Sequence, residues 1–515
     1  MFSPTSLLLL VLLGQSGICS QTPFQAADQE SAQICCQTFQ KELPSIVHLS
    51  SSPEYKSRLD TYYALQQTDL HPSCQLLPTS PSEVSRILKI ARDHDCPFAV
   101  RSGGYMSWSG SSNIDGGFVI DLRKLNQIDL SLHDGTVKLG PGSTWGEVYA
   151  AMNPYNLTTL GGRVKNVGVG GFLLGGGITF RSYTEGFSAD HILNYEVVLS
   201  DGTIVNANKD SHPDLYWALR AGSTNYGIVT RLDLPTFVSS TVSASQDVYF
   251  IEKTHTNDIL ENYISYVKEQ GSDVKHIAAV VLGQANGLDL AVTLRVYLGP
   301  NPSESYKPFT SATPIQQTET TGTLIDITNE IFSDKLYPPT RVNWNTLTIK
   351  LDKKFFWDFY TRGTEIFSDL KDREGLQWNI LFQPMTKGLI ESSSESLFYE
   401  ALKSSNDDLV LVLIITAWKN AADDQVMEEA AAKLSAWGEA EASKRGLLND
   451  FLYLNYASKA QPVYERSITK GDLATMRKVK QKYDPTGTFD KLWRGGFKLP
   501  QEKTHADREH DSSEL

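Results

Sequence analysis

A mixed α+β fold in two parts is predicted for this chain of 515 residues. Helical and strand patterns are interspersed over the first 235 residues, where hairpin signals indicate antiparallel pairing. Beyond Pro235 the glycine turns stop, and longer helices alternate with hairpins. The chain is also too long for one hydrophobic core, so two domains are expected.

The first clear element is a helix that begins after Ser80. Ser80-Pro81-Ser82-Glu83 combines a capping box with proline at the first helical position, and apolar residues at helical spacing continue to about Asp95. Residues 97–100 predict a buried strand, which ends at the glycine turn Arg101-Ser102-Gly103-Gly104-Tyr105. Helix, strand and turn together predict a phosphate cradle with Arg101 beside it.

Short strands and one more helix follow. Residues 117–122 predict a strand, Asp134-Gly135 a hairpin turn, and residues 196–205 a second hairpin. Thr144-Trp145-Gly146-Glu147 is another capping box, from which a helix runs toward Met152.

The segment from Gly161 to Gly177 is the most informative part of the sequence. Its glycines lie among apolar residues, whereas a flexible linker is polar. Glycine is expected where a ligand approaches the backbone too closely for a Cβ atom, and a phosphate-bearing cofactor is such a ligand. A Rossmann fingerprint does not match, because Leu173 stands where its third glycine belongs.

The second part of the chain shows a different pattern. One helical face is expected around residues 259–267, and apolar runs flank Asn286-Gly287, a strong hairpin signal. Residues 409–418 predict a buried strand, and residues 423–443 predict an alanine-rich helix.

An ordered set of motifs resembles one protein family. The motifs are residues 100–104, 117–122, 167–171, 189–190, 215–220, 225–230, 453–457 and 482–485. In this order they resemble the berberine-bridge-enzyme-like branch of the vanillyl-alcohol-oxidase flavoproteins, in the style of its fungal oxidases. The resemblance covers about residues 30–500.

The resemblance implies a bipartite architecture. An FAD-binding PCMH-type domain is expected from residues 21–235 and is completed by residues 451–500. A substrate domain of residues 236–450, an antiparallel sheet backed by helices, is inserted between them. Residues 501–515 are charged and are expected to form a disordered tail.

FAD contacts are also implied by the resemblance. Backbone N–H groups at residues 102–105 are expected to hold the pyrophosphate, residues 167–171 to lie along the cofactor, and residues 227–228 to lie near its adenine end. The expected contacts are Arg101, Ser102, Gly103, Gly104, Tyr105, Val164, Val167, Gly168, Gly170, Gly171, Gly227, Ile228 and Asn455. Core packing is the alternative role of Ile228.

Two positions depart from the family. The residue after the glycine pair is usually a histidine bonded to the flavin 8α carbon, and here it is Tyr105. The second tether is usually a cysteine, and here Val164 occupies its position. FAD is therefore expected to be non-covalent, with an aryl ether through Tyr105 as the alternative.

The implied chemistry is removal of a hydride from a small organic substrate to flavin N5, with O2 as the electron acceptor. In carbohydrate-oxidising relatives a tyrosine equivalent to Tyr456 is the base, and Asn455 is expected near the flavin. Tyrosine ordinarily ionises near pH 10, so a cation is needed, and Arg163 and Lys165 are the candidates. Core packing in a strand is the alternative role of Tyr456.

Other candidate residues carry weaker signals. Gln383-Pro384 ends an apolar run that is a candidate wall of the substrate site, and His191 is interpreted as structural. The histidines and cysteines lack metal-ligand spacing, so no metal is expected. A net charge of -13 without a basic run argues against nucleic acid as a partner.

The N-terminus predicts secretion. Residues 1–20 contain an apolar run from Leu7 to Leu13, typical of a signal peptide, and no later run is long enough to span a bilayer. A monomer, secreted or in the lumen of the secretory pathway, is expected. Four cysteines then remain, Cys35, Cys36, Cys74 and Cys96, and the adjacent pair is expected to join the other two with open connectivity. Asn156-Leu157-Thr158 is an N-glycosylation acceptor.

Three functions compete at this point. The first is an FAD-dependent oxidase of a small molecule, either a specialised metabolite or a carbohydrate. The second is a flavin-fold enzyme that catalyses a non-redox cyclisation. The third is a secreted flavin-binding protein without turnover.

Overall fold

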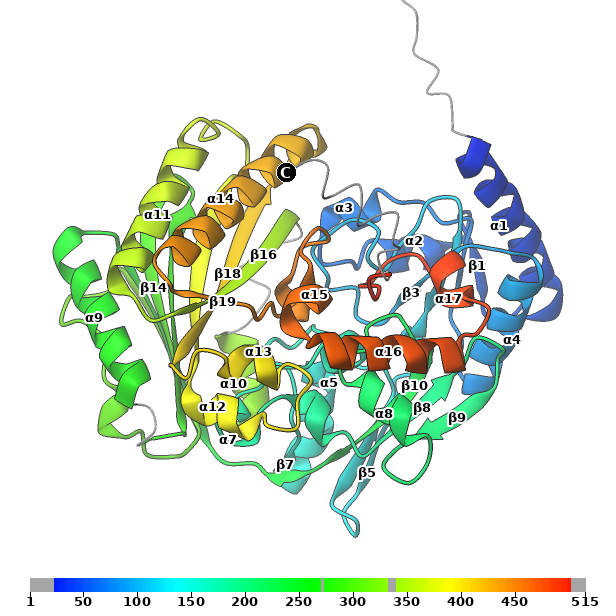
Figure 1. Ribbon diagram of the computed structural model, residues 1–515, viewed down its shortest axis with the longest axis horizontal. Helices are drawn as coiled ribbons and strands as arrows, with labels where there is room; N and C mark the ends of the chain where they lie inside the picture. Colours follow the sequence, from blue (N-terminus) through cyan, green and yellow to red (C-terminus); the bar gives the residue numbers. More distant parts are fainter. Residues whose placement is uncertain (1–22, 270–272, 332–339, 502–515) are drawn as a thin grey trace, which may run out of the picture.

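The computed structural model describes residues 23–269, 273–331 and 340–501, and it has the predicted mixed α+β architecture (Figure 1). An eight-stranded sheet and its covering helices form one side of the molecule, and smaller sheets form the other. The predicted signal peptide and the tail beyond Gln501 lie outside the described residues. Within the described residues, none of the helices has the length and apolarity needed to cross a membrane.

A four-stranded sheet carries the first glycine turn. Its order is β1 (Val47–Leu49), β2 (Cys74–Leu76), β4 (Phe118–Asp121) and β3 (Phe98–Arg101). The predicted helix is α4 (Pro81–Asp93), and Ser80 accepts from the Glu83 amide as expected. The Glu83 carboxylate accepts from Thr79 rather than from Ser80, so the reciprocal bond of the box is displaced by one residue.

Two disulfides join the long helix α1 (Pro23–Glu42) to strand β2 and to the connection between α4 and β3. They link Cys35 to Cys96 and Cys36 to Cys74. The prediction that the adjacent cysteines join the other two is confirmed, and the connectivity that the sequence left open is now defined.

A five-stranded sheet follows in the chain. Its order is β5 (Ile128–Ser131), β6 (Thr136–Leu139), β10 (Ile228–Pro235), β8 (Asn194–Val198) and β9 (Ile204–Ala207). Both predicted hairpins are present, and α5 (Trp145–Met152) begins at a complete capping box on Thr144.

The large sheet is antiparallel throughout. Its order is β15 (Gln316–Gly322), β12 (Val242–Phe250), β14 (Leu288–Tyr297), β13 (His276–Ala285), β17 (Gln377–Met385), β18 (Leu409–Trp418), β16 (Arg341–Lys350) and β19 (Leu448–Asn449). The predicted turn joins β13 to β14, with positive φ at both Asn286 and Gly287. Helices α9 (Lys253–Glu269), α11 (Lys353–Ser368) and α14 (Asp424–Lys444) cover one face (Figure 1).

The C-terminal segment returns to the smaller sheets. It contains η8 (Leu454–Tyr456), α15 (Val463–Ser467), α16 (Lys470–Tyr483) and α17 (Thr488–Lys491), and α16 packs on α8 (Pro213–Leu219). The remaining elements are α2 (Pro53–Leu59), α3 (Leu65–Thr68), η1 (Leu122–Lys124), η2 (Asn153–Tyr155), β7 (Leu157–Thr158), α6 (Val169–Leu174), α7 (Ser182–Glu185), η3 (Ser188–His191), β11 (Phe237–Val238), η5 (Glu304–Tyr306), α10 (Leu324–Glu330), α12 (Lys387–Ser392), α13 (Tyr399–Lys403) and η7 (Ala421–Asp423).

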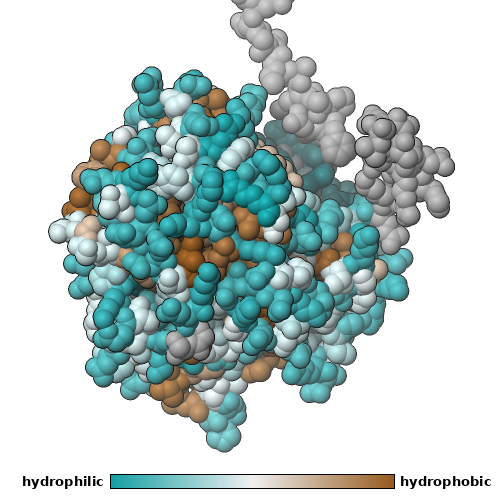
Figure 2. Space-filling model, turned by 60° about the vertical axis from the view of Figure 1, so that its left-hand side comes forward, coloured by the Kyte–Doolittle hydropathy of each residue, from teal (hydrophilic) through white to brown (hydrophobic). Residues whose placement is uncertain are grey.

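Hydrophilic residues cover most of the face in Figure 2, where hydrophobic residues gather in a few separate patches. A surface of this kind is typical of a face without a large apolar interface.

Candidate functional site

A cavity of about 710 Å³ lies between the glycine-rich segments and the uncovered face of the eight-stranded sheet. Successive side chains of a strand point to opposite faces of the sheet, so each strand contributes side chains both to the cavity and to the core under the helices. Val281, Leu381 and Leu413 line the cavity, whereas their neighbours Ile380 and Val412 belong to the core under the helices. The sheet therefore provides an apolar wall.

Two glycine turns meet at the opposite wall. A Cβ atom added to Gly103 would lie 2.5 Å from the amide nitrogen of Gly168 and 2.7 Å from its Cα atom. Gly162 packs in the same way on the Trp145 ring, and Gly170 packs on Pro141. Contacts with protein atoms thus explain these glycines, whereas the sequence suggested a ligand at this backbone.

The second half of the glycine segment contains a short helix. Residues 169–174 form the short helix α6, in which Gly171 differs from the other glycines. A Cβ atom added to Gly171 meets no atom within 4 Å, and this residue lines the cavity. Its backbone is therefore the part of the segment that is open to a ligand.

The first turn has the geometry of an anion cradle. Gly104 has a φ of +68°, which disfavours a side chain. Within the described residues, the amide N–H groups of Gly103 and Gly104 have no protein acceptor. Successive backbone donors in such a turn bind phosphate oxygens, so the turn fits the diphosphate of a nucleotide cofactor.

Arg101 supports this turn from beneath. Its side chain is buried, donates to Thr61 Oγ1 at 2.8 Å and lies with its guanidinium carbon 3.6 Å from the centre of the Tyr62 ring. An ion pair of 3.8 Å links it to Asp121. Arg101 is not among the described residues that line the cavity, so it holds the backbone in place instead of facing a ligand.

The other residues expected to bind the cofactor fall into two groups: those that line the cavity and those that pack only against other parts of the protein. Gly227 packs against β8, where an added Cβ atom would lie 2.8 Å from the Val198 oxygen, and it is not among the described lining residues. The expected residues that line the cavity are Ser102, Gly103, Gly104, Tyr105, Val164, Val167, Gly168, Gly170, Gly171, Ile228 and Asn455.

Tyr105 and Val164, the two positions that usually carry flavin tethers, both face the cavity. The Tyr105 ring stacks on Tyr63, with the ring centres 4.1 Å apart and the planes inclined by 17°. Trp344 completes this aromatic group, 5.5 Å from Tyr63 and 6.3 Å from Tyr105. Sequence reasoning missed Tyr63, which lies outside the motifs, and Trp344, which has no distinctive signal in its strand.

A polar centre lies beside the aromatic group. Arg163 Nη2 donates to Tyr456 Oη at 2.8 Å and to Gln383 Oε1 at 2.6 Å, and Tyr456 Oη donates to Gln383 Oε1 at 3.3 Å. The Trp344 ring meets the Tyr456 ring edge to face at 6.0 Å. Tyr456 lies in the 3-10 turn η8 and not in a strand, and it packs against the hydrophobic core, as its alternative role requires. Of the two candidate cations, Arg163 contacts Tyr456, whereas Lys165 donates to Asn329 at 3.4 Å.

Asn455 fixes the turn that carries Tyr456. Its Nδ2 atom donates to the Phe172 oxygen and to Tyr453 Oη, both at 3.0 Å. Tyr453 Oη also accepts from the Ile178 amide at 2.9 Å, and burial raises the pKa of this phenol. A Cβ atom on Gly175 would lie 2.8 Å from the Asn455 Cγ atom, so glycine is required there.

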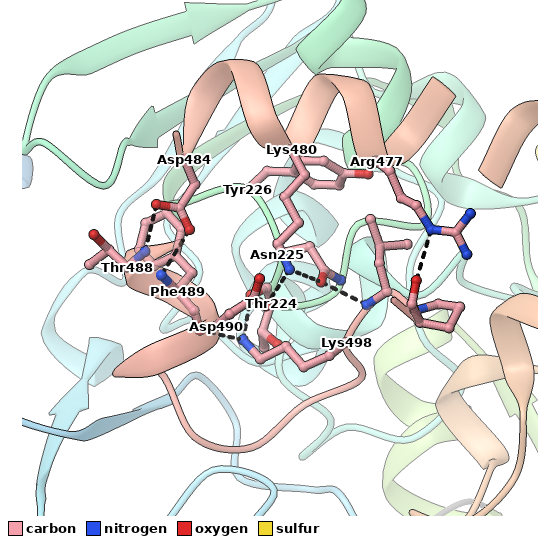
Figure 3. Close-up of polar contacts among 12 residues, drawn as sticks. Thr224, Asn225, Tyr226, Arg477, Lys480, Asp484, Thr488, Phe489, Asp490 and Lys498 are labelled. Atoms are coloured by element: carbon pink, nitrogen blue, oxygen red, sulfur yellow. Dashed lines mark hydrogen bonds and ion pairs between the residues drawn. The ribbon is translucent and has the colours of Figure 1, made fainter. Parts of the chain in front are cut away.

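Trp493, Gly496 and Phe497, near the C-terminal end of the described chain, also line the cavity, and Figure 3 shows the polar contacts of the neighbouring segment. Asn225 Oδ1 accepts from the Leu499 amide at 2.9 Å and from Lys480 Nζ at 3.3 Å. Lys498 Nζ donates to the oxygens of Thr224 at 2.8 Å and Phe489 at 3.0 Å, and burial lowers the pKa of Lys498 to about 7. We call this group the C-terminal clasp; it holds Trp493, Gly496 and Phe497 against the cavity.

Comparisons with known proteins agree with this geometry. The FAD binding domain family matches residues 72–208. The FAD-dependent monooxygenase tpcD of Cochliobolus heterostrophus is 30% identical over 453 residues, which cover 85% of this chain and 87% of that protein.

Solved structures share the fold. The berberine-bridge-enzyme-like protein 1 of Physcomitrella patens superposes with a TM-score of 0.73 at 19% identity, covering 92% of this chain and all of that one. Berberine bridge enzyme from Eschscholzia californica gives a TM-score of 0.72 at 18% identity, covering 89% and 97%.

Proposed function

Because this chain belongs to the berberine-bridge-enzyme-like FAD-linked oxidoreductases, we propose that it removes a hydride from a small organic molecule and uses O2 as electron acceptor. The observation that carries this proposal is the contact of Arg163 with Tyr456 and Gln383 at the apolar sheet wall. This arrangement places a proton acceptor, a cation and a water-poor surface around one point.

FAD fits the part of the cavity that lies away from the sheet. The backbone of Gly103 and Gly104 would hold its diphosphate, the exposed backbone of Gly171 would lie against it, and Ile228 and Phe497 would enclose its nucleotide end. When bound, FAD supplies the hydride acceptor and the reaction with O2. Tyr105 and Val164 stand at the tether positions, so we propose that the cofactor is held without a covalent bond.

Tyr456 is the proposed base. Loss of a hydride from a carbon that bears a hydroxyl or amino group leaves one proton to remove, and the phenolate oxygen of Tyr456 accepts it. Arg163 donates to this oxygen at 2.8 Å and stabilises its negative charge. Gln383 is fully buried and keeps the guanidinium in place by accepting from it at 2.6 Å.

Purified protein tests the proposal in two steps. Absorbance measures whether FAD is bound, and acid precipitation then releases a non-covalent flavin into the supernatant; flavin that stays in the pellet would contradict the non-covalent model. Anaerobic mixing with a substrate should bleach the flavin, and admission of air should restore it with one H2O2 per turnover. Product formed without bleaching would favour a cyclisation instead.

The name of the relative tpcD suggests an alternative reaction, the insertion of oxygen into the product. That relative is called a monooxygenase, and an oxygen-inserting reaction would transfer one atom of O2 to the product. Turnover under ¹⁸O2 should leave the product unlabelled if the proposal is correct. Label in the product would replace the oxidase by a monooxygenase.

Secretion is proposed from the disulfides. Two buried disulfides are typical of a chain that folds in an oxidising compartment. Asn156 of the glycosylation acceptor is exposed on a turn with a φ of +53°, where an oligosaccharide finds room. Mass spectrometry of the secreted protein should show a glycan on Asn156 and a new N-terminus near residue 20.

A further inference from the structure

The aromatic group of Tyr63, Tyr105 and Trp344 comes from three separate parts of the chain. Tyr63 precedes α3, Tyr105 ends the first glycine turn, and Trp344 lies on β16 of the eight-stranded sheet. All three residues line the cavity and are half-buried. Their rings therefore offer aromatic surface to a molecule in the cavity.

A hydrogen bond and a ring contact join this group to the turn that fits a diphosphate. The Tyr63 amide donates to the Gly104 oxygen at 3.1 Å, so Tyr63 is fixed to the same turn that carries Tyr105. The two rings then stack with their centres 4.1 Å apart, and stacking of this kind stabilises a ring pair beyond its burial alone. The stacked pair thus adjoins the proposed diphosphate site as one rigid wall.

The segment that follows Tyr63 connects the same group to the large sheet. Gln66 is buried, donates from Nε2 to the Val342 oxygen at 2.5 Å and accepts from the Val342 amide at 3.2 Å. Trp344 lies two residues further along this strand, with its ring 5.5 Å from the Tyr63 ring. Hydrogen bonds therefore hold the strand of Trp344 at a fixed distance from the glycine turn.

The aromatic group also borders the polar centre. The Trp344 ring meets the Tyr456 ring edge to face at 6.0 Å. In the proposed reaction the hydride acceptor must lie close to Tyr456, which takes the proton. This requirement assigns the isoalloxazine ring of FAD, and not its adenine ring, to the aromatic group, and it leaves the adenine to Ile228 and Phe497, which also line the cavity.

We propose that the aromatic group is the non-covalent anchor of the isoalloxazine ring. This inference rests on the proposed function, in which FAD forms no covalent bond and its ring depends on contacts alone. The glycine turn holds the cofactor by polar backbone groups, whereas the aromatic group offers planar surfaces that suit a planar ring system. Tyr63 is the central member, because it contacts both other rings and donates to the turn.

The test compares FAD with ADP, which carries the adenosine and the diphosphate but no isoalloxazine ring. Calorimetry on purified protein freed of flavin should show that Tyr63→Leu weakens FAD binding at least about tenfold, or about 1.4 kcal/mol, and changes ADP binding by less than about twofold. Tyr63→Phe keeps the ring and should bind FAD within about threefold of the unchanged protein. A smaller loss of FAD affinity in Tyr63→Leu, an equal loss of ADP affinity, or a similar loss in Tyr63→Phe overturns the proposal.

A second variant tests the anchor from the sheet. Trp344→Leu should also weaken FAD binding and leave ADP binding unchanged, and it serves if Tyr63→Leu does not fold. Trp437→Leu is the matched control, because this half-buried ring stacks on Phe359 at 5.9 Å and is not among the described lining residues. A protein that binds no FAD contradicts the proposed function, whereas equal FAD affinities of the Trp344→Leu and Trp437→Leu variants contradict only the anchor.

Discussion

Substitution of Gly171 by alanine separates the requirements of the fold from those of a bound cofactor. The added methyl group meets no protein atom within 4 Å, and the backbone has no positive φ. Alanine at a compatible site in a helix stabilises a protein by about 0.4–1 kcal/mol. If FAD lies against this backbone, the same methyl group overlaps it at a cost of about 1–3 kcal/mol, which is roughly a 5- to 150-fold weaker affinity.

Two measurements check this prediction. Urea unfolding of the FAD-free protein should show a Gly171→Ala variant at least as stable as the unchanged chain, and a titration by flavin fluorescence should show weaker FAD binding. Gly471→Ala is the matched control, because this helical glycine has only an ordinary contact at 3.8 Å and is not among the described lining residues. Unchanged FAD affinity in Gly171→Ala would refute the assignment of this backbone to the cofactor.

Three further predictions follow from the site and its surroundings. Tyr456→Phe should lower the rate of substrate-dependent O2 consumption by about 10²- to 10⁴-fold at unchanged FAD content, and a rate equal to that of the unchanged protein would exclude Tyr456 as the base. Burial lowers the pKa of Lys498 to about 7 from 10.5. Between pH 7 and pH 10.5 the folded protein therefore binds fewer protons than the unfolded chain, so its free energy of unfolding should rise with pH. Lys498→Met should lack this rise, of at most about 1.4 kcal/mol per pH unit, in urea titrations at pH 7 and pH 9. Burial raises the pKa of Asp190 to about 7 from 3.8, although the charge of Arg220 opposes this shift. The folded protein therefore keeps the carboxyl proton of Asp190 at pH values where the unfolded chain loses it, so the free energy of unfolding should fall as pH rises from 4 to 7. Asp190→Asn should gain stability relative to the unchanged chain over the same range, and a difference independent of pH would exclude this titration.

Elements with strong local signals could be predicted from the sequence. The capping box at Thr144 and the Asn286-Gly287 turn each determine backbone geometry within a few residues, and the structure confirms both. The disulfide connectivity and the contact between Arg163 and Tyr456, which joins residues 293 positions apart, depend instead on how distant segments pack.

The glycine segment shows why local reasoning has a limit. Its composition indicates that atoms lie close to the backbone, and this is correct. It does not tell whether those atoms belong to a ligand or to the protein itself, and for Gly103 and Gly168 they belong to each other. Trp344 is a similar case, because an alternating strand predicts which side chains share a face but not which face borders a cavity.

The C-terminal clasp has a consequence for biogenesis. Lys498 and Leu499 bind residues more than 270 positions earlier in the chain, so they leave the ribosome long after their partners. During translation the earlier segments emerge without the piece that closes their pocket. A ligand can therefore be enclosed there only after this later segment has been made and has folded back onto residues 224 and 225.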